Sequence, residues 1–381
     1  MTPASFFAAY DAFGERRAGG AGDATSAAWL REEAERAGAE AILVPAPFTR
    51  LVPGRALIET AGMTVEGLPL FDGGLTPRYG ITGALGALGS DAAIGFAELH
   101  PTAASLPGNA FARARQQSRH RGIVIAMRTK PDGLAPLNAH DIEAPFGPPV
   151  LQVAGRDASR LATLAAAGAT ARLVVDGTRA PSASHSVRAT LVGTAPPLVL
   201  LTPRTSWWTS TAERGGGIFA WLEALRALAA SPRARAVVAL ATCGHELGHV
   251  GARRIYTDEP ALARDAALTI HLGANLGAAE EPHLVVRSNV DGLADRMAGA
   301  LASAGYPRAP IEPVTGGAAN GEAHEIATRG GRYLSLIGRN PWFHAPEDRW
   351  PVSVDLPRAE AIARAVAAVA IESACTADQV A

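Results

Sequence analysis

The sequence predicts an α/β fold in which helices cover both faces of a mixed, mostly parallel sheet, with a small β-rich module inserted into it. After residue 180, apolar strand-like runs alternate with amphipathic helical segments, as in proteins built on such a sheet. Residues 50 to about 150 are instead rich in Gly and Pro, with short β-like runs and little helical periodicity. This change of texture favours a separate β-rich insertion.

The first element is a helix over 23–38, because Asp23 is a good capping residue and Gly38 is a stop signal. Short apolar runs then predict strands, and 3.6-residue periodicity predicts helices. The expected strands cover 41–46, 149–153, 171–175, 188–193, 197–202, 236–243, 266–273, 283–288 and 331–338. The expected helices after the first cover 157–167, 218–230, 289–305 and 359–373.

Composition narrows the function classes. Of the 381 residues, 48% are hydrophobic and 19% are charged, and the formal net charge is -1, so a globular fold is expected. Lys and Arg form no basic stripe, which argues against nucleic acid and anionic membranes as partners. Two cysteines, Cys243 and Cys375, predict reduced thiols and no disulfide framework. With no signal-peptide pattern and no long apolar span, a soluble cytoplasmic protein is expected.

Residues 245–249 read HELGH, which satisfies the H-E-x-x-H pattern of zinc proteases. On one helix, His245 and His249 would bind zinc and Glu246 would act as general base. The apolar run before it predicts a strand that ends just ahead of His245, and Gly244 and Gly248 weaken a helix there. The pattern therefore favours a strand end, and the helical zinc-protease arrangement is the less favoured alternative.

Four collinear segments resemble the M28 family of zinc aminopeptidases, which also includes glutaminyl cyclases. SHSVRATLVGTAPPLVLLTP resembles the segment leading to the strand with the family's first metal-binding His, and ERGGGIFAWLEAL resembles its D-x-x-x-G helix start. GHELGHVGAR resembles G-E-E-x-G-L-x-G-S, and WFHAPEDRWPVSVDL resembles Y-H-T-P-x-D-x-x-x-x-[IV]-D. The resemblance implies a zinc-exopeptidase-like domain over 1–61 and 177–381, with an inserted protease-associated (PA)-like domain over 62–176.

The ligand set departs from the family pattern. The first His and its H-x-D partner should lie near 202–205, which reads TPRT, and the later Asp should lie near Gly273 and Ala274. Two of the family's five ligand positions therefore lack a metal-binding side chain. The resemblance implies at most one zinc ion, although another divalent metal is an alternative. The retained positions are those through which the single-zinc cyclases are expected to hold their metal: Glu213, Glu246 and His344.

Other histidines are candidates to complete this centre. His271 shares a strand face with Gly273, and His249 is the other reserve ligand. His245 stands at the family's general-base position and has the side chain for that role. Arg204, close to the lost ligands, is a candidate to bind a substrate carboxylate or to occupy the place of the metal.

Each candidate also has a structural explanation. Glu213 is suited to a helix N-terminus, His344 to a turn before Pro346, and His245 and His249 to the surface of a loop-to-helix turn. Glu246 at a buried strand end needs a partner, either a metal or Arg204. Cys243 is expected in the core. A solvated helix start is the favoured reading of three further residues: Glu322, His324 and Glu325.

Together these observations predict a metal-dependent hydrolase of an amide or peptide-type bond in a small molecule or short peptide. The first alternative is a catalytically inactive relative that binds a ligand in the former active-site cleft. The second alternative is a single-zinc acyl transferase or cyclase of the glutaminyl-cyclase type.

Overall fold

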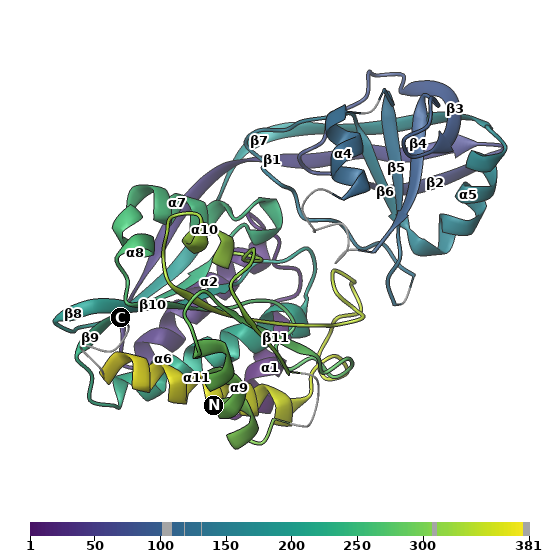
Figure 1. Ribbon diagram of the computed structural model, residues 1–381. Helices are drawn as coiled ribbons and strands as arrows, with labels where there is room; N and C mark the ends of the chain where they lie inside the picture. The colour runs from purple at the N-terminus through teal and green to yellow at the C-terminus, as the bar shows by residue number, and fades with distance from the viewer. Residues whose placement is uncertain (101–108, 118, 131, 307–310, 376–381) are drawn as a thin grey trace.

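The computed structural model describes residues 1–100, 109–117, 119–130, 132–306 and 311–375. Thirteen strands of the described chain form one continuous sheet, in the order β1-β2-β6-β5-β4-β3-β7-β9-β8-β10-β13-β11-β12. Figure 1 shows two lobes, a larger one with most helices and a smaller one joined to it by two long strands.

The sheet of the larger lobe is mixed and has a parallel centre. Its strands are β7 (Thr170–Leu191), β9 (Arg235–Thr242), β8 (Ala195–Pro203), β10 (Leu268–Leu272), β13 (Tyr333–Gly338), β11 (Leu284–Ser288) and β12 (Ile311–Thr315). β9, β8, β10 and β13 run parallel to one another, whereas β7 and β11 flank them in the antiparallel sense. The carboxyl ends of the parallel strands therefore meet at one edge of the sheet, where α/β proteins place their sites.

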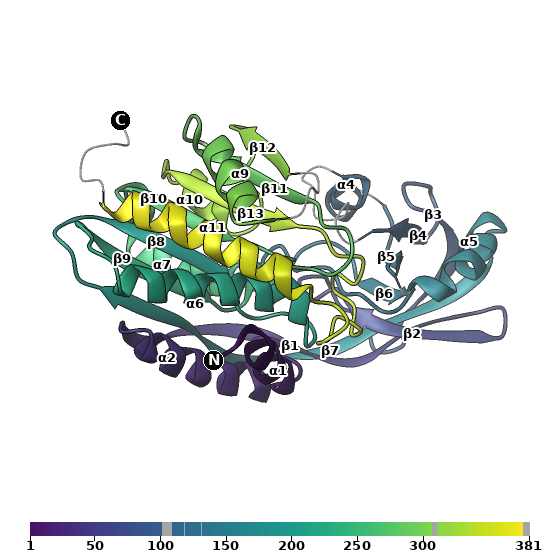
Figure 2. The same ribbon diagram turned by 90° about the horizontal axis from the view of Figure 1, so that it is seen from below.

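Helices cover both faces of this sheet. One face packs α1 (Pro3–Ala12), α2 (Ala21–Arg36), α6 (Gly216–Ala229), α9 (Leu293–Ser303) and α11 (Leu356–Cys375) against the largest hydrophobic core. Figure 2 shows α6 and α11 side by side on that face. The other face is covered by α7 (Val250–Asp258), α8 (Pro260–Arg264) and α10 (Ala323–Ala327). The predicted α/β class with helices on both faces is confirmed.

The smaller lobe is β-rich. It contains β2 (Met63–Pro69), β3 (Ile81–Ala87), β4 (Ile94–Leu99), β5 (Gly122–Met127) and β6 (Val150–Ala154), with helices α4 (Ala110–Gln117) and α5 (Ala158–Ala166). Two hydrophobic clusters fill it, one under α5 and one under α4. Helix α4 lies inside the stretch for which little helical periodicity was expected.

Two long strands connect the lobes. β1 (Glu40–Thr60) pairs with β7 along almost its whole length in an antiparallel ribbon, with a register shift between Pro53 and Ala56. The predicted domain boundaries, 61/62 and 176/177, fall just after β1 and inside β7, so continuous strands cross from one lobe to the other. Among the described residues, no helix is long and apolar enough to cross a membrane.

Candidate active site

A group of buried ionisable side chains lies where β8, β9 and β10 end, between the helical layers on the two faces of the sheet. Ion pairs, shared neighbours and mutual electrostatic effects link its members. We call it the central cluster: Glu213, Arg214, His245, His271, Glu322 and His344.

Glu213 and Arg214 come from an irregular turn between β8 and α6. Residues Thr211–Gly215 form one π-helical turn, a geometry that is frequent at functional sites. The carboxylate of Asp348 holds the turn by accepting hydrogen bonds from the backbone N–H groups of Ala212 and Glu213, both at 2.9 Å. The turn thus places two charged side chains of opposite sign in the protein interior.

The Glu213 carboxylate is fully buried, and neither of its oxygens accepts a hydrogen bond from a described residue. Its Oε1 lies 2.8 Å from Nη2 of Arg214 and 3.5 Å from Nε2 of His344. Burial favours the protonated form, but the Arg214 charge and then His344 outweigh it and lower the pKa of Glu213 to about 2. Glu213 is therefore an anion held by adjacent positive or polar groups.

His344 contacts the smaller lobe as well as Glu213. Its Nδ1 lies 2.6 Å from the carbonyl oxygen of Pro136, so Nδ1 carries a hydrogen and donates a hydrogen bond to that oxygen. Its Nε2 has no hydrogen-bond partner in the described part of the chain. The imidazole is thereby oriented with Nε2 toward Glu213, and the predicted pair of Glu213 and His344 is brought together.

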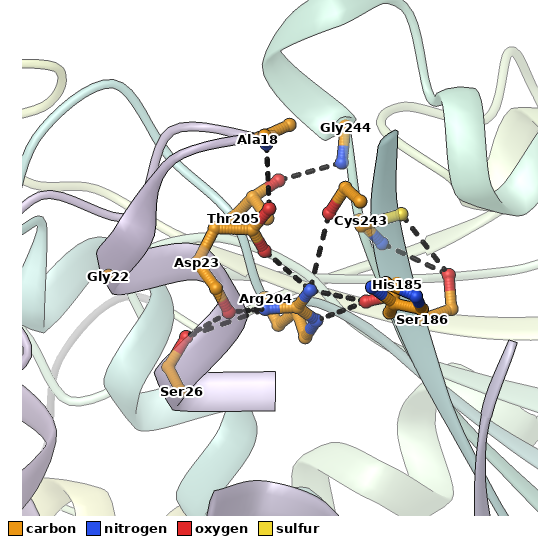
Figure 3. Close-up of polar contacts among 12 residues, drawn as sticks. Ala18, Gly22, Asp23, Ser26, His185, Ser186, Arg204, Thr205, Cys243 and Gly244 are labelled. Carbon is orange, nitrogen blue, oxygen red and sulfur yellow. Dashed lines mark hydrogen bonds and ion pairs between the residues drawn. The ribbon is translucent and has the colours of Figure 1, made fainter. Parts of the chain in front are cut away.

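Glu246, the central candidate of the sequence, is enclosed by neutral donors. Its Oε1 accepts a hydrogen bond from the backbone N–H of Ala18 at 2.7 Å, and its Oε2 accepts one from the Thr205 hydroxyl at 2.6 Å. Figure 3 shows Ala18 and Thr205 on this side of the site, with the Thr205 hydroxyl also accepting from the backbone N–H of Gly244. Burial raises the pKa of Glu246.

His245 begins a 3-10 turn, His245–Leu247, directly after β9, so the predicted strand end is confirmed. Its Nδ1 lies 3.3 Å from Oε1 of Glu322, and the other Glu322 oxygen accepts a hydrogen bond from the Thr242 hydroxyl at 2.5 Å. Burial, followed by the charge of Arg214, lowers the pKa of His245 well below its ordinary value. The imidazole is therefore neutral at neutral pH.

His249 lies beside His245 but has a different carboxylate partner. The two rings stack with centroids 4.8 Å apart, and Nδ1 of His249 lies 3.2 Å from Oε1 of Glu325. His249 has φ 61° and precedes α7, so residues 245–249 do not share one helix. The helical zinc-protease arrangement is therefore wrong for this chain.

His271 points from β10 into the cluster. Its Nδ1 lies 2.8 Å from the Ser335 hydroxyl, while its Nε2 has no hydrogen-bond partner among the residues described. A Cβ added to Gly321 would lie 3.2 Å from Cε1 of His271 and 3.9 Å from Cε1 of His245, so both rings border that glycine. Burial, with smaller effects of His249 and Arg214, lowers the pKa of His271 to about 3.

Arg204 lies among residues of α2 and β7, including Asp23, Ser26 and His185 (Figure 3). Its guanidinium lies 2.5 Å from the carboxylate of Asp23 and donates to the carbonyl oxygens of Asp23 and His185. The hydroxyls of Ser26 and Ser184 accept further hydrogen bonds. Arg204 therefore joins α2 to β7, and these contacts use the donors that a substrate carboxylate would need.

The solvated helix start expected for residues 322–325 is wrong for its two carboxylates. Glu322 is fully buried against His245, and Glu325 is 5% exposed and binds His249 and Arg329. His324 is exposed, as expected. The packing of α10 against α7 and β13 buries Glu322 and Glu325. The Gly-rich sequence before these residues does not indicate this packing.

The side chains present do not fit a zinc shell. A catalytic zinc ion usually has three protein ligands, and within the described ranges no group of three or more His, Cys, Asp or Glu side chains could hold a metal ion. Of the predicted ligands, only Glu213 and His344 meet. Glu246 and His249 have other partners, and Arg214 already lies against the Glu213 carboxylate.

The backbone around the cluster is conformationally unusual. One member of the cluster, His344 (62°), and three residues that border it have positive φ although none is glycine: Ser210 (45°), His249 (61°) and Asn275 (65°). Such conformations cost about 1 to 3 kcal/mol each, and they concentrate at functional sites. Their position around one buried cluster marks this edge of the sheet as the candidate active site.

Comparison with solved structures identifies proteins of the same fold. An aminopeptidase from Aneurinibacillus sp. strain AM-1 matches with a TM-score of 0.74 and 16% identity, over 100% of this chain and 95% of that chain. A zinc aminopeptidase from Bacillus subtilis matches with a TM-score of 0.74 and 17% identity, over 96% and 93%. A peptidase M28 precursor from Shewanella amazonensis matches with a TM-score of 0.75 and 16% identity, over 98% and 93%.

The chain thus has the fold of M28-type zinc peptidases, and the resemblance found in its sequence is confirmed at the level of the fold. No protein-family model matches the sequence, and no curated protein matches it.

Proposed function

We propose that this chain hydrolyses an amide or peptide-type bond in a small molecule or short peptide. The observation that carries the proposal is the pair of His245 and Glu322 at the carboxyl end of β9, in a fold shared with aminopeptidases. Peptide-bond hydrolysis is the chemistry of the aminopeptidases that share this fold, and the residues assigned to it below are those of this chain.

His245 is proposed as the general base. Glu322 accepts a hydrogen bond from Nδ1–H and so directs the lone pair of Nε2 away from the carboxylate. Because the imidazole is neutral at neutral pH, Nε2 can take a proton from an attacking water. The His245 side chain is 11% exposed, whereas Glu322 is fully buried, so the base is the member of the pair that reaches solvent.

Positive charge for the developing oxyanion comes from Arg214 in this proposal. Its guanidinium is buried. Nη2 forms an ion pair with Oε1 of Glu213 at 2.8 Å, and Nη1 has no hydrogen-bond acceptor in the described structure. A fixed positive charge away from bulk water stabilises an anionic intermediate more strongly than an exposed one does. No step of this mechanism passes through a metal ion, because the residues do not fit a zinc shell.

The test is hydrolysis of aminoacyl anilides, simple amides and short peptides by the full chain and two variants. His245→Ala and Glu322→Gln should each lower kcat/KM by about 10²- to 10⁴-fold, the usual contribution of a general base. His283→Ala is a matched control, because His283 is a half-buried histidine that also pairs with a carboxylate, Glu312, but stands outside the central cluster. Equal activity in His245→Ala and the control would contradict the proposed base.

A second candidate function is binding of an amide-containing ligand without turnover. The enclosure of Glu246 by Ala18 and Thr205 favours it, because this carboxylate has no free oxygen with which to act on a substrate. Calorimetric binding of the same amides, without any product after prolonged incubation, would support this function. If the chain only binds these amides, His344→Ala should lower the affinity for them and have no effect on product formation, because no product forms.

A further inference from the structure

Arg214 is an uncommon residue to find at the centre of a buried site. Its side chain is 0% exposed, and Nε donates a hydrogen bond to the carbonyl oxygen of Thr205 at 2.9 Å. Its Nη2 lies 2.8 Å from Oε1 of Glu213, and within the described residues Nη1 and Nη2 have no hydrogen-bond acceptor. A guanidinium stays charged in proteins, so this interior holds a permanent positive charge.

The positive charge reaches most members of the site. Arg214 acts electrostatically on Glu213 and Glu322, on His245 and His271, and also on Glu246. The Arg214 charge therefore acts on the surrounding carboxylates and imidazoles as the charge of a bound cation would. Its backbone position is fixed by the π-helical turn and Asp348, so the charge is part of the fold.

We propose that the guanidinium of Arg214 takes the place of a metal ion in this centre and keeps divalent cations from Glu213 and His344. Oε1 of Glu213 and Nε2 of His344 lie 3.5 Å apart, and neither atom forms a hydrogen bond with a described residue. These two atoms are therefore the donors that a metal would use. A divalent ion bound there would lie next to the guanidinium, and like charges at such short range repel strongly in a buried site.

The experiment measures zinc binding by the full chain and requires no substrate. After incubation with zinc chloride and dialysis, the unmodified protein should retain well under one equivalent of zinc by elemental analysis. Arg214→Gln removes the charge and keeps a polar side chain, so it should bind one zinc ion at least about 100-fold more tightly in calorimetric titration. Arg214→Lys keeps the charge and should behave like the unmodified protein.

Two further variants locate the site. Adding Glu213→Gln or His344→Ala to Arg214→Gln should abolish the gained binding, because these residues supply the donors. If Arg214→Gln folds only when zinc is present, the ion has replaced the guanidinium and the proposal is supported.

Three outcomes would overturn the proposal. The first is one equivalent of zinc in the unmodified protein that Glu213→Gln removes. The second is a folded Arg214→Gln protein that gains no zinc, and the third is an Arg214→Gln protein that stays unfolded even in zinc. None of these readouts depends on amide hydrolysis, so the inference and the proposed function can fail separately.

Discussion

Thr205 connects three parts of the candidate site through one hydroxyl and one carbonyl group. The hydroxyl donates to Glu246 and accepts from the backbone N–H of Gly244, and the carbonyl accepts from Nε of Arg214. All of these groups are buried, so each needs its partner. The Thr205 side chain thereby fixes the position of an acid and of a turn, and its backbone carbonyl fixes the position of the internal cation.

Replacing Thr205 with Val keeps the shape of the side chain and removes the hydroxyl. The change should lower the free energy of unfolding by about 1 to 3 kcal/mol, because a buried carboxylate and a buried N–H lose a partner. Urea denaturation measures the effect. Thr178→Val, on the exposed side of β7, is the matched control and should change stability little. Equal stabilities of the two variants would show that the hydroxyl does not hold the site together.

At this scale the sequence predicted part of the site. The family resemblance pointed to Glu213 and His344, and these meet in the structure. It could not identify Arg214 or Thr205, because neither occupies a position with a recognisable chemical pattern, and their roles arise only from the burial that packing imposes. Arg204 was a candidate because of its place in the motif. Its actual partners, such as Asp23, lie far away in sequence, so the motif could not indicate them.

Among the elements, α1 is attached to the π-helical turn by a single carboxylate. Asp11, near the end of α1, accepts hydrogen bonds from the Arg349 guanidinium, the Thr211 hydroxyl and the backbone N–H of Trp350. Burial alone would raise the pKa of Asp11, but these donors outweigh it and lower that pKa. The helix is therefore held beside the π-helical turn by an ionised side chain.

Asp11→Asn should destabilise the protein by about 1 to 3 kcal/mol near neutral pH, through loss of charged hydrogen bonds. A lowered folded-state pKa adds stability above the unfolded-state pKa, near 3.9, and this stability is lost as the pH falls through the folded-state value. The difference between the two proteins should therefore be constant above about pH 5 and shrink below about pH 4. Unfolding by urea at several pH values measures it. Asp91→Asn, at an exposed position, is the control, and a difference that grows in acid would contradict the sign.

The elements show where sequence patterns were reliable. The helix predicted at 23–38 is α2, and the apolar run at 236–243 is β9, since each has a strong pattern. The predicted cap was wrong, because α2 begins at Ala21 after Gly20 and Asp23 lies inside its first turn. β1 extends well beyond the predicted 41–46. Three prolines, at 45, 47 and 53, obscure that strand, which is stabilised by its long pairing with β7. The π-helical turn has no sequence signal of its own.

For the molecule as a whole, one small hydrophobic cluster joins the two lobes to the site. We call it the junction core, and it contains Ala18, Phe48, Leu51, Phe71, Ala139, Ile142, Trp207 and Leu247. Trp207 lies at its centre, with its ring 4.5 Å from that of Phe71 and its Nε1 donating to Asn138. Backbone hydrogen bonds from Ala139 and Ile142 to residues 246 and 247 strengthen the same contact.

Trp207→Ala should remove about 3 to 5 kcal/mol of stability and uncouple the lobes. We expect one urea transition in the unmodified protein and two in the variant. Circular dichroism and hydrogen exchange of the 244–249 backbone measure these transitions. Trp207→Phe retains the aromatic packing and should keep a single transition. A single transition in Trp207→Ala would mean that the β1–β7 ribbon alone couples the lobes.

The ribbon also makes the smaller lobe removable in principle. Pro53 and Gly177 are direct partners across β1 and β7, so the chain leaves the larger lobe and returns to it at the same point. A two-residue Asn-Gly hairpin turn could therefore close the chain there. The larger lobe would keep β1 up to Pro53, β7 from Gly177 and all its other strands. Pro136, whose carbonyl orients His344, would leave with the excised segment. The shortened protein would thus separate the scaffold from the contacts by which its insertion reaches the candidate active site, among them those of Pro136 and Ala139.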